Sequence, residues 1–150
     1  NEWEVASGVP HIPFEALDEN YEIDKEAYLK YFRKMHHLFP KCKKMVMAVR
    51  NQIASSHHTL SGLLYDAVED QLYTTRIYDI EPIVDPMGVG DAFVAAYIHA
   101  HQKWGDKNQY CLDFSLSASA IKNTIPGDQN LVSEEEIINN MTSSGGRIQR

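Results

Sequence analysis

Apolar residues recur at three- and four-residue spacing between Asp24 and Leu38. They are Ala27, Tyr28, Tyr31, Phe32, Met35 and Leu38. This spacing is that of an amphipathic helix. Asp24 in front of the segment and Pro40 just beyond it are typical of a helix start and stop. The pattern therefore predicts a helix over 24–38 with one buried face.

Strand-like segments follow this helix. Met45–Val49 is a continuous apolar run, typical of a short strand covered on both faces in a parallel sheet. Two β-prone segments, 60–65 and 71–78, flank the acidic sequence 66–70, and this arrangement predicts a hairpin. A helix that leads into a buried strand indicates an α/β fold.

A glycine-containing loop separates the strands from the next helix. Two prolines and two glycines interrupt regular structure over 82–90. Helical periodicity then resumes from Asp91 to Trp104. The sequence thus predicts a loop that leads directly into a helix N-terminus.

Two further helices are predicted near the end of the chain. The first spans Tyr110–Lys122, is rich in serine and alanine, and stops at the sequence 126–128. Ser133 and Glu136 have the Ser-x-x-Glu spacing of a capping box, which predicts a last helix to about Met141. No internal repeat interrupts this order, so we expect residues 1–150 to form one domain.

The composition limits the possible partners and compartments. A formal charge of −7 argues against a nucleic-acid-binding surface. No apolar run is long enough to cross a membrane. Cys42 and Cys111 have neither metal-ligand nor disulfide-framework spacing, so we expect idle thiols in a reducing cytoplasm. No signal peptide is visible, and we expect Asn1 to be a cut point.

The loop at Gly88–Asp91 is the best candidate for chemistry. A Gly-x-Gly turn that opens a helix leaves backbone N–H groups unpaired at the positive end of the helix dipole, where phosphate oxygens bind. Asp91 falls in the first helical turn, close enough to take a proton from a hydroxyl that attacks a phosphoryl group.

The same loop is also compatible with a purely structural role. Aspartate is favoured in any first helical turn, so Gly-x-Gly-Asp alone fits a plain helix start equally well. A dinucleotide-binding loop needs a third glycine where Phe93 stands, and a Walker A loop needs Gly-Lys-Ser/Thr, which is absent. Both of these rival phosphate loops are disfavoured.

The longer motif Asp-x-x-Gly-x-Gly-Asp-Ala-Phe-x-Ala, which begins at Asp85, resembles the second signature of the ribokinase (PfkB) family of carbohydrate kinases. The resemblance implies that Asp91 is the catalytic base and that the amides of Gly88, Val89 and Gly90 form the anion hole. Val89 departs from the family, which prefers alanine or glycine there, and its β-branched side chain could crowd the nucleotide.

Other motifs extend the resemblance. Asn1 and Glu4 are similar to the family's Asn-x-x-Glu motif, which implies that they organise Mg²⁺. Three places resemble the subgroup of 2-keto-3-deoxygluconate kinases, namely 49–57 with 64–66, 78–80 with 83–85, and 120–128. Pro86 departs from this subgroup, which commonly has arginine there.

The resemblance also implies residues that bind the nucleotide. They are Arg50, Asp85, Leu116, Ala120 and Asn123. Helix packing accounts equally well for the small and apolar residues of the 116–123 segment.

The implied fold is a three-layer αβα ribokinase-like domain with a mainly parallel sheet, and the chain would be the C-terminal half of it. The implied reaction is ATP-dependent phosphorylation of a sugar or sugar-acid hydroxyl, with 2-keto-3-deoxygluconate as the first candidate and Mg²⁺ as the second cofactor. Alternatives are fructokinase or nucleoside kinase activity, or a non-catalytic α/β scaffold domain. Because the sugar pocket and lid would lie in the missing half, we expect an inactive fragment that self-associates or pairs with that half.

Two histidine pairs, 36–37 and 57–58, invite a metal hypothesis. Adjacent side chains point to opposite faces of a strand and diverge on a helix, so neither pair chelates well by itself. Glutamates 134–136 are more simply interpreted as an acidic first helical turn.

Overall fold

The helix predicted at 24–38 is present in the computed structural model, which describes residues 20–143 and the backbone of 147–148. This helix, α2, spans Lys25–Leu38 and buries Tyr28, Tyr31, Phe32 and Met35. The side chain of Asp24 caps it by accepting a hydrogen bond from the amide of Ala27 at 3.0 Å. The sequence prediction is confirmed, and the helix belongs to the first of two units into which the chain divides.

The first unit consists of residues up to Val46 and of 64–72. The ring of Phe32 stacks on that of Tyr65, with centroids 5.7 Å apart. Arg33 donates two hydrogen bonds to Asp70, at 2.9 and 2.6 Å, and the hydroxyl of Tyr65 donates a third at 2.8 Å. An aromatic contact and a shared carboxylate therefore hold α2 to the hairpin turn at 66–70.

The strands run through both units. Their bounds are β1 Lys44–Ala54, β2 His57–Asp66, β3 Gln71–Thr74, β4 Tyr78–Ile80 and β5 Arg147–Ile148. The order is β1-β2-β4-β5, and β3 also pairs with β2. The register of β2 on β4 is antiparallel, with His58 opposite Ile80 and Leu60 opposite Tyr78, whereas β4 and β5 are parallel.

Two expectations about the sheet are corrected. The sheet is not mainly parallel, because strands joined by short connections pair antiparallel. The run 45–49 belongs to a longer strand whose residues are half-buried or exposed, so it is not covered on both faces. Among the described strands β1 stands at the end of the order, beside β2. The α/β class itself is confirmed.

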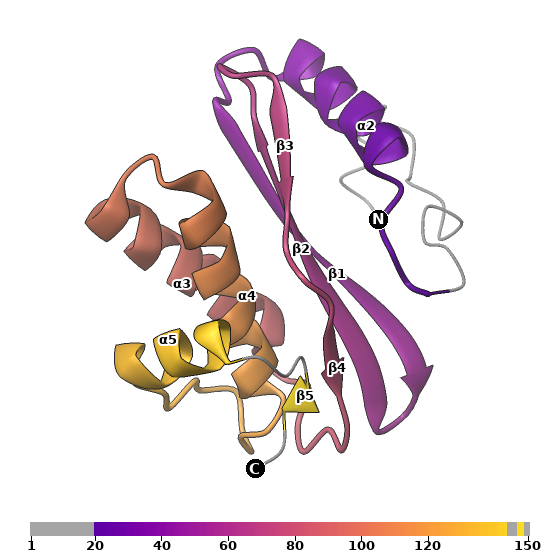
Figure 1. Ribbon diagram of the computed structural model, residues 1–150, viewed down its shortest axis with the longest axis vertical. Helices are drawn as coiled ribbons and strands as arrows, with labels where there is room; N and C mark the ends of the chain where they lie inside the picture. The colour runs from indigo at the N-terminus through magenta and orange to yellow at the C-terminus, as the bar shows by residue number, and fades with distance from the viewer. Residues whose placement is uncertain (1–19, 144–146, 149–150) are drawn as a thin grey trace. The chain divides into compact units, whose positions relative to one another are not determined.

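The second unit, Met47–Leu63 with the chain from Tyr73 onward, holds the other helices of the described residues. They are α3 Val89–Trp104, α4 Asn108–Lys122 and α5 Glu134–Thr142. Figure 1 shows these three helices together on one side of the strands of this unit. Gly62 of β2 lets Leu112 of α4 approach, since a β-carbon there would stand 3.2 Å from the leucine side chain.

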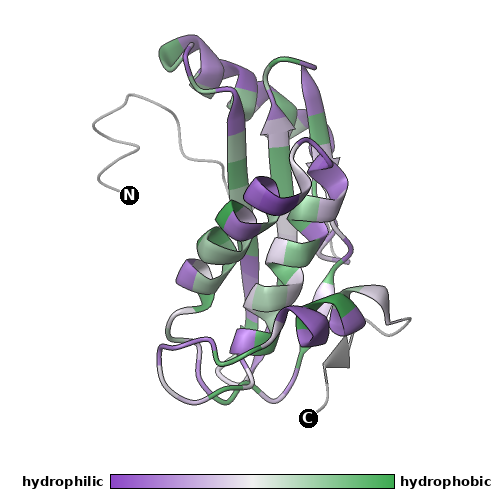
Figure 2. Cartoon of the chain, turned by 90° about the vertical axis from the view of Figure 1, so that its left-hand side faces the viewer, coloured by the Kyte–Doolittle hydropathy of each residue, from purple (hydrophilic) through white to green (hydrophobic). Residues whose placement is uncertain are grey.

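A core of small and aromatic residues joins these helices. Its buried members are Ala96, Ala100, Cys111, Phe114, Ala118, Ile121, Ile125 and Ile137. The capping box predicted at Ser133 and Glu136 is present and starts α5. Each helix carries both hydrophilic and hydrophobic positions (Figure 2). Within the described residues no helix has the length and apolar character needed to cross a membrane.

Candidate functional site

The segment from Asp85 to Asp91 is a loop that is anchored by one carboxylate. Oδ1 of Asp85 accepts a hydrogen bond from the amide of Met87 at 2.9 Å. Its Oδ2 accepts one from the amide of Gly127 at 2.8 Å. These two amides and the positive charge of Lys122 hold the pKa of Asp85 below its ordinary value, the Met87 amide having the largest effect. Asp85 thus ties the loop both to itself and to the turn at 126–128.

Gly88 lies where the loop turns into α3. Its φ of 73° is in the left-handed region, which side chains other than that of glycine rarely allow. A β-carbon at this position would also overlap the backbone carbonyl of Asp128. Both the backbone conformation and the close approach of Asp128 therefore require glycine here, at a helix start that has no side-chain cap.

The next residues face open space. Gly90 is exposed, and a β-carbon there would meet no atom within 4 Å. Asp91 is exposed as well, and within the described residues its carboxylate has no hydrogen-bond or ion-pair partner. The first amides of a helix have no intrahelical carbonyl to bind. An anion could therefore approach these amides beside a free carboxylate.

The side chain of Val89 points the other way. It is buried, 8% exposed, and so does not occupy the open side of the loop. The hydroxyl of Ser119 on α4 donates to the backbone carbonyl of Val89 at 3.0 Å. The expected crowding of the nucleotide by this β-branched residue has no basis in this geometry.

The C-terminal end of α4 supports the loop from behind. The carbonyl of Asn123 accepts hydrogen bonds from the amides of Val84 and Asp85, at 2.8 and 3.2 Å. The side-chain amide of Asn123 in turn donates to the carbonyl of Ser119 at 3.0 Å. The loop therefore rests on a helix end that is itself fixed by buried polar contacts.

The other predicted nucleotide-binding residues lie in different surroundings. Leu116 and Ala120 are completely buried in α4, which supports a packing role for these two side chains. Arg50 is exposed on β1. Asn1 and Glu4, predicted to organise magnesium, lie outside the described residues. The structure therefore brings together Asp85, Asn123 and the 88–91 segment.

A metal site is not apparent in the described part of the chain. No group of three or more histidine, cysteine or acidic side chains there could hold an ion. His57 pairs with Asp79 across β2 and β4, with Nε2 and Oδ1 2.5 Å apart. The ring of His58 is buried, and burial is the main cause of its lowered pKa. The ring of His57 thus pairs with a carboxylate whereas that of His58 is buried, as expected if adjacent side chains of a strand point to opposite faces.

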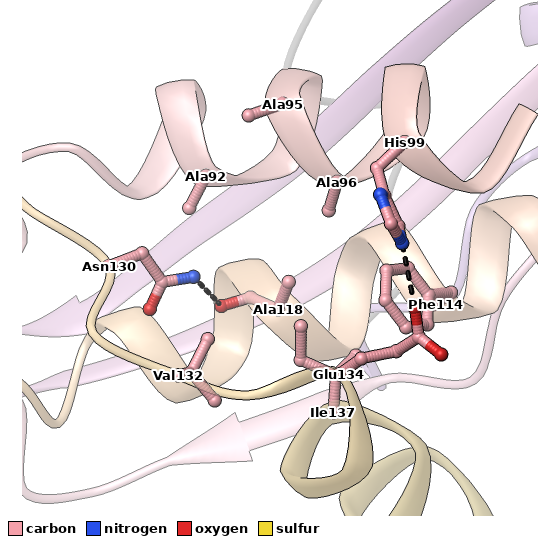
Figure 3. A pocket seen from close by; sticks show the side chains of 10 residues that line it. All are labelled: Ala92, Ala95, Ala96, His99, Phe114, Ala118, Asn130, Val132, Glu134 and Ile137. Carbon is pink, nitrogen blue, oxygen red and sulfur yellow. Dashed lines mark hydrogen bonds and ion pairs between the residues drawn. The ribbon is translucent and has the colours of Figure 1, made fainter. Parts of the chain in front are cut away.

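A groove of about 290 Å³ lies beside α3 from Ala92 onward (Figure 3). Its walls come from α3, α4, the segment before α5 and α5 itself. They are Ala92, Ala95, Ala96, His99, Phe114, Ala118, Asn130, Val132, Glu134 and Ile137. At one end Nε2 of His99 lies 2.8 Å from one carboxylate oxygen of Glu134, and the other oxygen accepts from Lys103 at 2.6 Å. None of the residues 85–91 lines it, so it is separate from the loop.

Sequence reasoning missed the residues that clamp the loop. From the pattern alone Gly127 and Asp128 mark only the end of a helix, yet both contact the 85–88 segment through their backbones. Lys122 likewise marks a helix end in the sequence, although its side chain is fully buried. The resemblance of the 120–128 stretch to one kinase subgroup is the signal that could have indicated a role for all three.

Comparison with known proteins supports the resemblance at the level of structure. No protein-family model matches the sequence, and no curated protein matches it significantly. Among solved structures, the 2-dehydro-3-deoxygluconokinase of Thermotoga maritima is 29% identical, with a TM-score of 0.73 over 79% of this chain and 35% of the kinase.

Two further solved structures agree. A PfkB family carbohydrate kinase from Listeria grayi is 30% identical, with a TM-score of 0.71 over 75% of this chain and 34% of that protein. A third structure, from Enterococcus faecalis, is 16% identical and supports the fold alone, with a TM-score of 0.69 over 93% of this chain and 38% of the other. The chain spans about a third of the length of the proteins that it matches.

Proposed function

Because the structural neighbours of this chain include carbohydrate kinases of the PfkB family, we propose that it forms the nucleotide-binding part of a kinase that phosphorylates a sugar hydroxyl. The observation that carries the proposal is that an exposed Asp91, which has no partner among the described residues, directly follows Gly90, which faces open space at the start of α3. The more specific substrate is 2-keto-3-deoxygluconate, a sugar acid, on the basis of the Thermotoga maritima neighbour. Fructokinase activity is the alternative within the family.

Each residue of the loop has a defined role in this proposal. The amides of Gly88, Val89 and Gly90 bind the oxygens of the transferred phosphoryl group and stabilise the charge that develops on it. Asp91 accepts the proton of the attacking hydroxyl, for which an accessible carboxylate is suitable. Asp85 keeps the loop in place, since both its oxygens bind amides.

ATP would supply the phosphoryl group, and Mg²⁺ would neutralise charge on its phosphates when bound. Among the described residues, Gly90 faces open space that phosphate oxygens could enter, and no group of three or more side chains there could hold a metal ion. Asn1 and Glu4 are therefore the proposed magnesium organisers. Arg50 and Asn123 are the proposed neighbours of adenine and ribose, and Leu116 and Ala120 would form the packed floor behind them.

The sugar pocket is expected to come from parts of the kinase that this chain does not span. The isolated chain should then bind nucleotide without converting sugar. Among the described strands β1 stands at the end of the order, and such an edge strand favours self-association or pairing with the rest of the kinase. A single monomeric peak in size-exclusion chromatography at high concentration would contradict this part of the proposal.

Nucleotide binding can be tested by thermal unfolding. A ligand that binds only the folded state stabilises it by about 2.7 kcal/mol at a hundredfold excess over its dissociation constant. ATP with Mg²⁺ should therefore raise the melting temperature of the chain, and Asp91→Asn should keep most of that rise. A melting temperature that does not respond to ATP would favour a non-catalytic scaffold domain instead.

The role of Asp91 requires the complete kinase and a coupled assay with 2-keto-3-deoxygluconate. Asp91→Asn should lower kcat by about 10²- to 10⁴-fold, the usual contribution of a general base. Glu135→Gln is the matched control, because it removes the same charge from an exposed position on α5. Equal activity of the two variants would show that Asp91 is not the base.

A further inference from the structure

A lysine side chain is completely buried directly behind the loop. Lys122 is the last residue of α4, and its exposed fraction is 0%. Its ammonium donates a hydrogen bond to the carbonyl of Ile125 at 2.9 Å, which is its one hydrogen-bond partner in the described part of the chain. A charge removed from water is costly unless its surroundings compensate it. The burial of the Lys122 ammonium with one hydrogen-bond partner among the described residues therefore needs a structural explanation.

The surroundings of Lys122 supply negative potential. The aligned peptide groups of a helix make its C-terminal end the negative end of the helix dipole, and a cation is favourable there. The negative charge of the Asp85 carboxylate adds to this potential. The attraction is mutual, since the positive charge of Lys122 is one of the causes of the lowered pKa of Asp85. The ammonium of Lys122 thus interacts electrostatically with Asp85 at the start of the loop.

The turn that follows Lys122 makes most of the contacts that hold the loop. The carbonyl of Asn123 accepts from two loop amides, the amide of Gly127 donates to Asp85, and the carbonyl of Asp128 lies against Gly88. Ile125 stands in the middle of this turn, and its amide also bonds back to the carbonyl of Lys122 at 3.1 Å. Any shift of Ile125 would therefore move the groups that contact the loop.

We propose that Lys122 is a positioning residue of the nucleotide site, whose ammonium holds the 123–128 turn against the loop by its bond to the Ile125 carbonyl. This inference rests on the proposed function, since the loop matters only if it binds phosphate. Lys122 does not touch the phosphates. It sets the distance between the amides that do so and the helix end behind them.

The test compares a ligand that has phosphates with one that has none. Dissociation constants of the chain for ADP with Mg²⁺ and for adenosine are measured by calorimetry. Lys122→Met keeps an unbranched side chain of nearly the same length and removes its charge. We expect its affinity for ADP to fall at least tenfold while its affinity for adenosine changes less than twofold. A purely structural role would weaken both ligands alike, and that result would overturn the proposal.

The control is Lys30→Met, which removes a charge from an exposed position on α2 and should change neither constant. If the wild-type chain does not bind ADP, the proposed function fails. If the wild-type chain binds ADP and folded Lys122→Met binds it within twofold, the present inference alone fails.

Chemical rescue provides a second measurement in case Lys122→Met does not fold. Lys122→Cys, in a chain with Cys42→Ser and Cys111→Ala, is alkylated while unfolded and then refolded. Bromoethylamine forms a carbon–sulfur bond with loss of bromide and places an ammonium at nearly the original position. Bromopropane gives a neutral side chain of the same length. Only the aminoethyl form should bind ADP with the affinity of its unmodified Lys122 parent. Equal affinity of both forms, or failure of the folded aminoethyl form to bind, would overturn the proposal.

Discussion

A β-carbon on Gly88 would occupy the space taken by the carbonyl oxygen of Asp128. The contact joins two segments that are far apart in the sequence, the loop before α3 and the turn after α4. The left-handed φ of Gly88 and this close approach both arise from the same requirement, which is to bring the loop onto the end of α4. The position is therefore sensitive to any side chain, however small.

Gly88→Ala should destabilise the protein substantially. The left-handed backbone costs a non-glycine residue about 1–2 kcal/mol, and the overlap with Asp128 forces the turn to move as well. We expect a loss of about 2 kcal/mol or more in the free energy of unfolding, measured by urea denaturation. A loss below about 0.5 kcal/mol, the usual range for surface substitutions, would show that the loop relaxes freely.

Gly90→Ala is the matched comparison two residues later. A methyl group there meets no neighbouring atom, and alanine is the better helix former. The free energy of unfolding should therefore stay the same or rise slightly. The methyl group would nevertheless stand on the open side of the proposed anion site, so ADP should bind more weakly. Unchanged ADP affinity would argue that phosphate does not approach at Gly90.

The Asp70 carboxylate gives the first unit a pH-dependent contribution to stability. Hydrogen bonds from Arg33 and then from Tyr65 lower its pKa from 3.8 to about 2. Since the folded pKa lies below the unfolded one, the contribution is present above about pH 4 and is lost as the pH falls towards 2. NMR titration of the Asp70 side chain in the folded protein should give a pKa of about 2. The stability difference between wild type and Asp70→Asn should shrink over the same range.

Phe114→Ala tests the core of the second unit. The ring is 1% exposed, and its centroid lies 5.1 Å from that of Trp104. Removing a buried phenylalanine ring leaves a cavity and typically costs about 3–5 kcal/mol. Val94→Ala on α3 is the control, because half of that side chain is already exposed and its truncation should cost little. Equal effects in urea denaturation would mean that the Phe114 site collapses without penalty.

Ser133→Ala tests the capping box of α5. The serine hydroxyl accepts a hydrogen bond from the amide of Glu136 at 3.2 Å, and the Glu136 carboxylate accepts one from the amide of Ser133 at 2.9 Å. Loss of an N-cap side chain costs about 1 kcal/mol. Ser133→Thr keeps the hydroxyl and should retain most of the stability. If alanine and threonine behave alike, the cap does not contribute measurably.

The helices could be predicted because their signals are local. Asp24 with the apolar spacing that follows it, and Ser133 with Glu136, lie within one or two turns of the helix starts that they specify. The predicted start of α3 is two residues late, since Gly88 caps the helix through its backbone conformation and provides no side-chain signal.

The sheet was harder to predict for a physical reason. Strand β1 extends beyond its apolar run to Ala54, because hydrogen bonds to β2 and not side-chain burial hold its polar end. The single β-prone segment 71–78 is divided into β3 and β4. Thr75 interrupts it, with its amide donating to Gly62 and its hydroxyl accepting from the Gly62 amide.

The candidate site was predictable in its first half only. Asp85 and the 88–91 segment stand together in one motif, so a pattern in the sequence could identify them. Their support comes from Asn123, Gly127 and Asp128, which become neighbours only when α3 and α4 fold back on each other. The pattern of a single sequence does not indicate which residues so far apart along the chain come into contact.

The backbone of the loop is anchored, but the side chains at its tip are not. Pro86 and Met87 are exposed, and Met87 contributes only its amide to the anchor. The side chains at these two positions can therefore be exchanged while the backbone keeps its course. A library that randomises both positions would sample different surfaces beside Asp91 on an unchanged frame, which makes this tip a natural place to begin redesigning what the protein recognises.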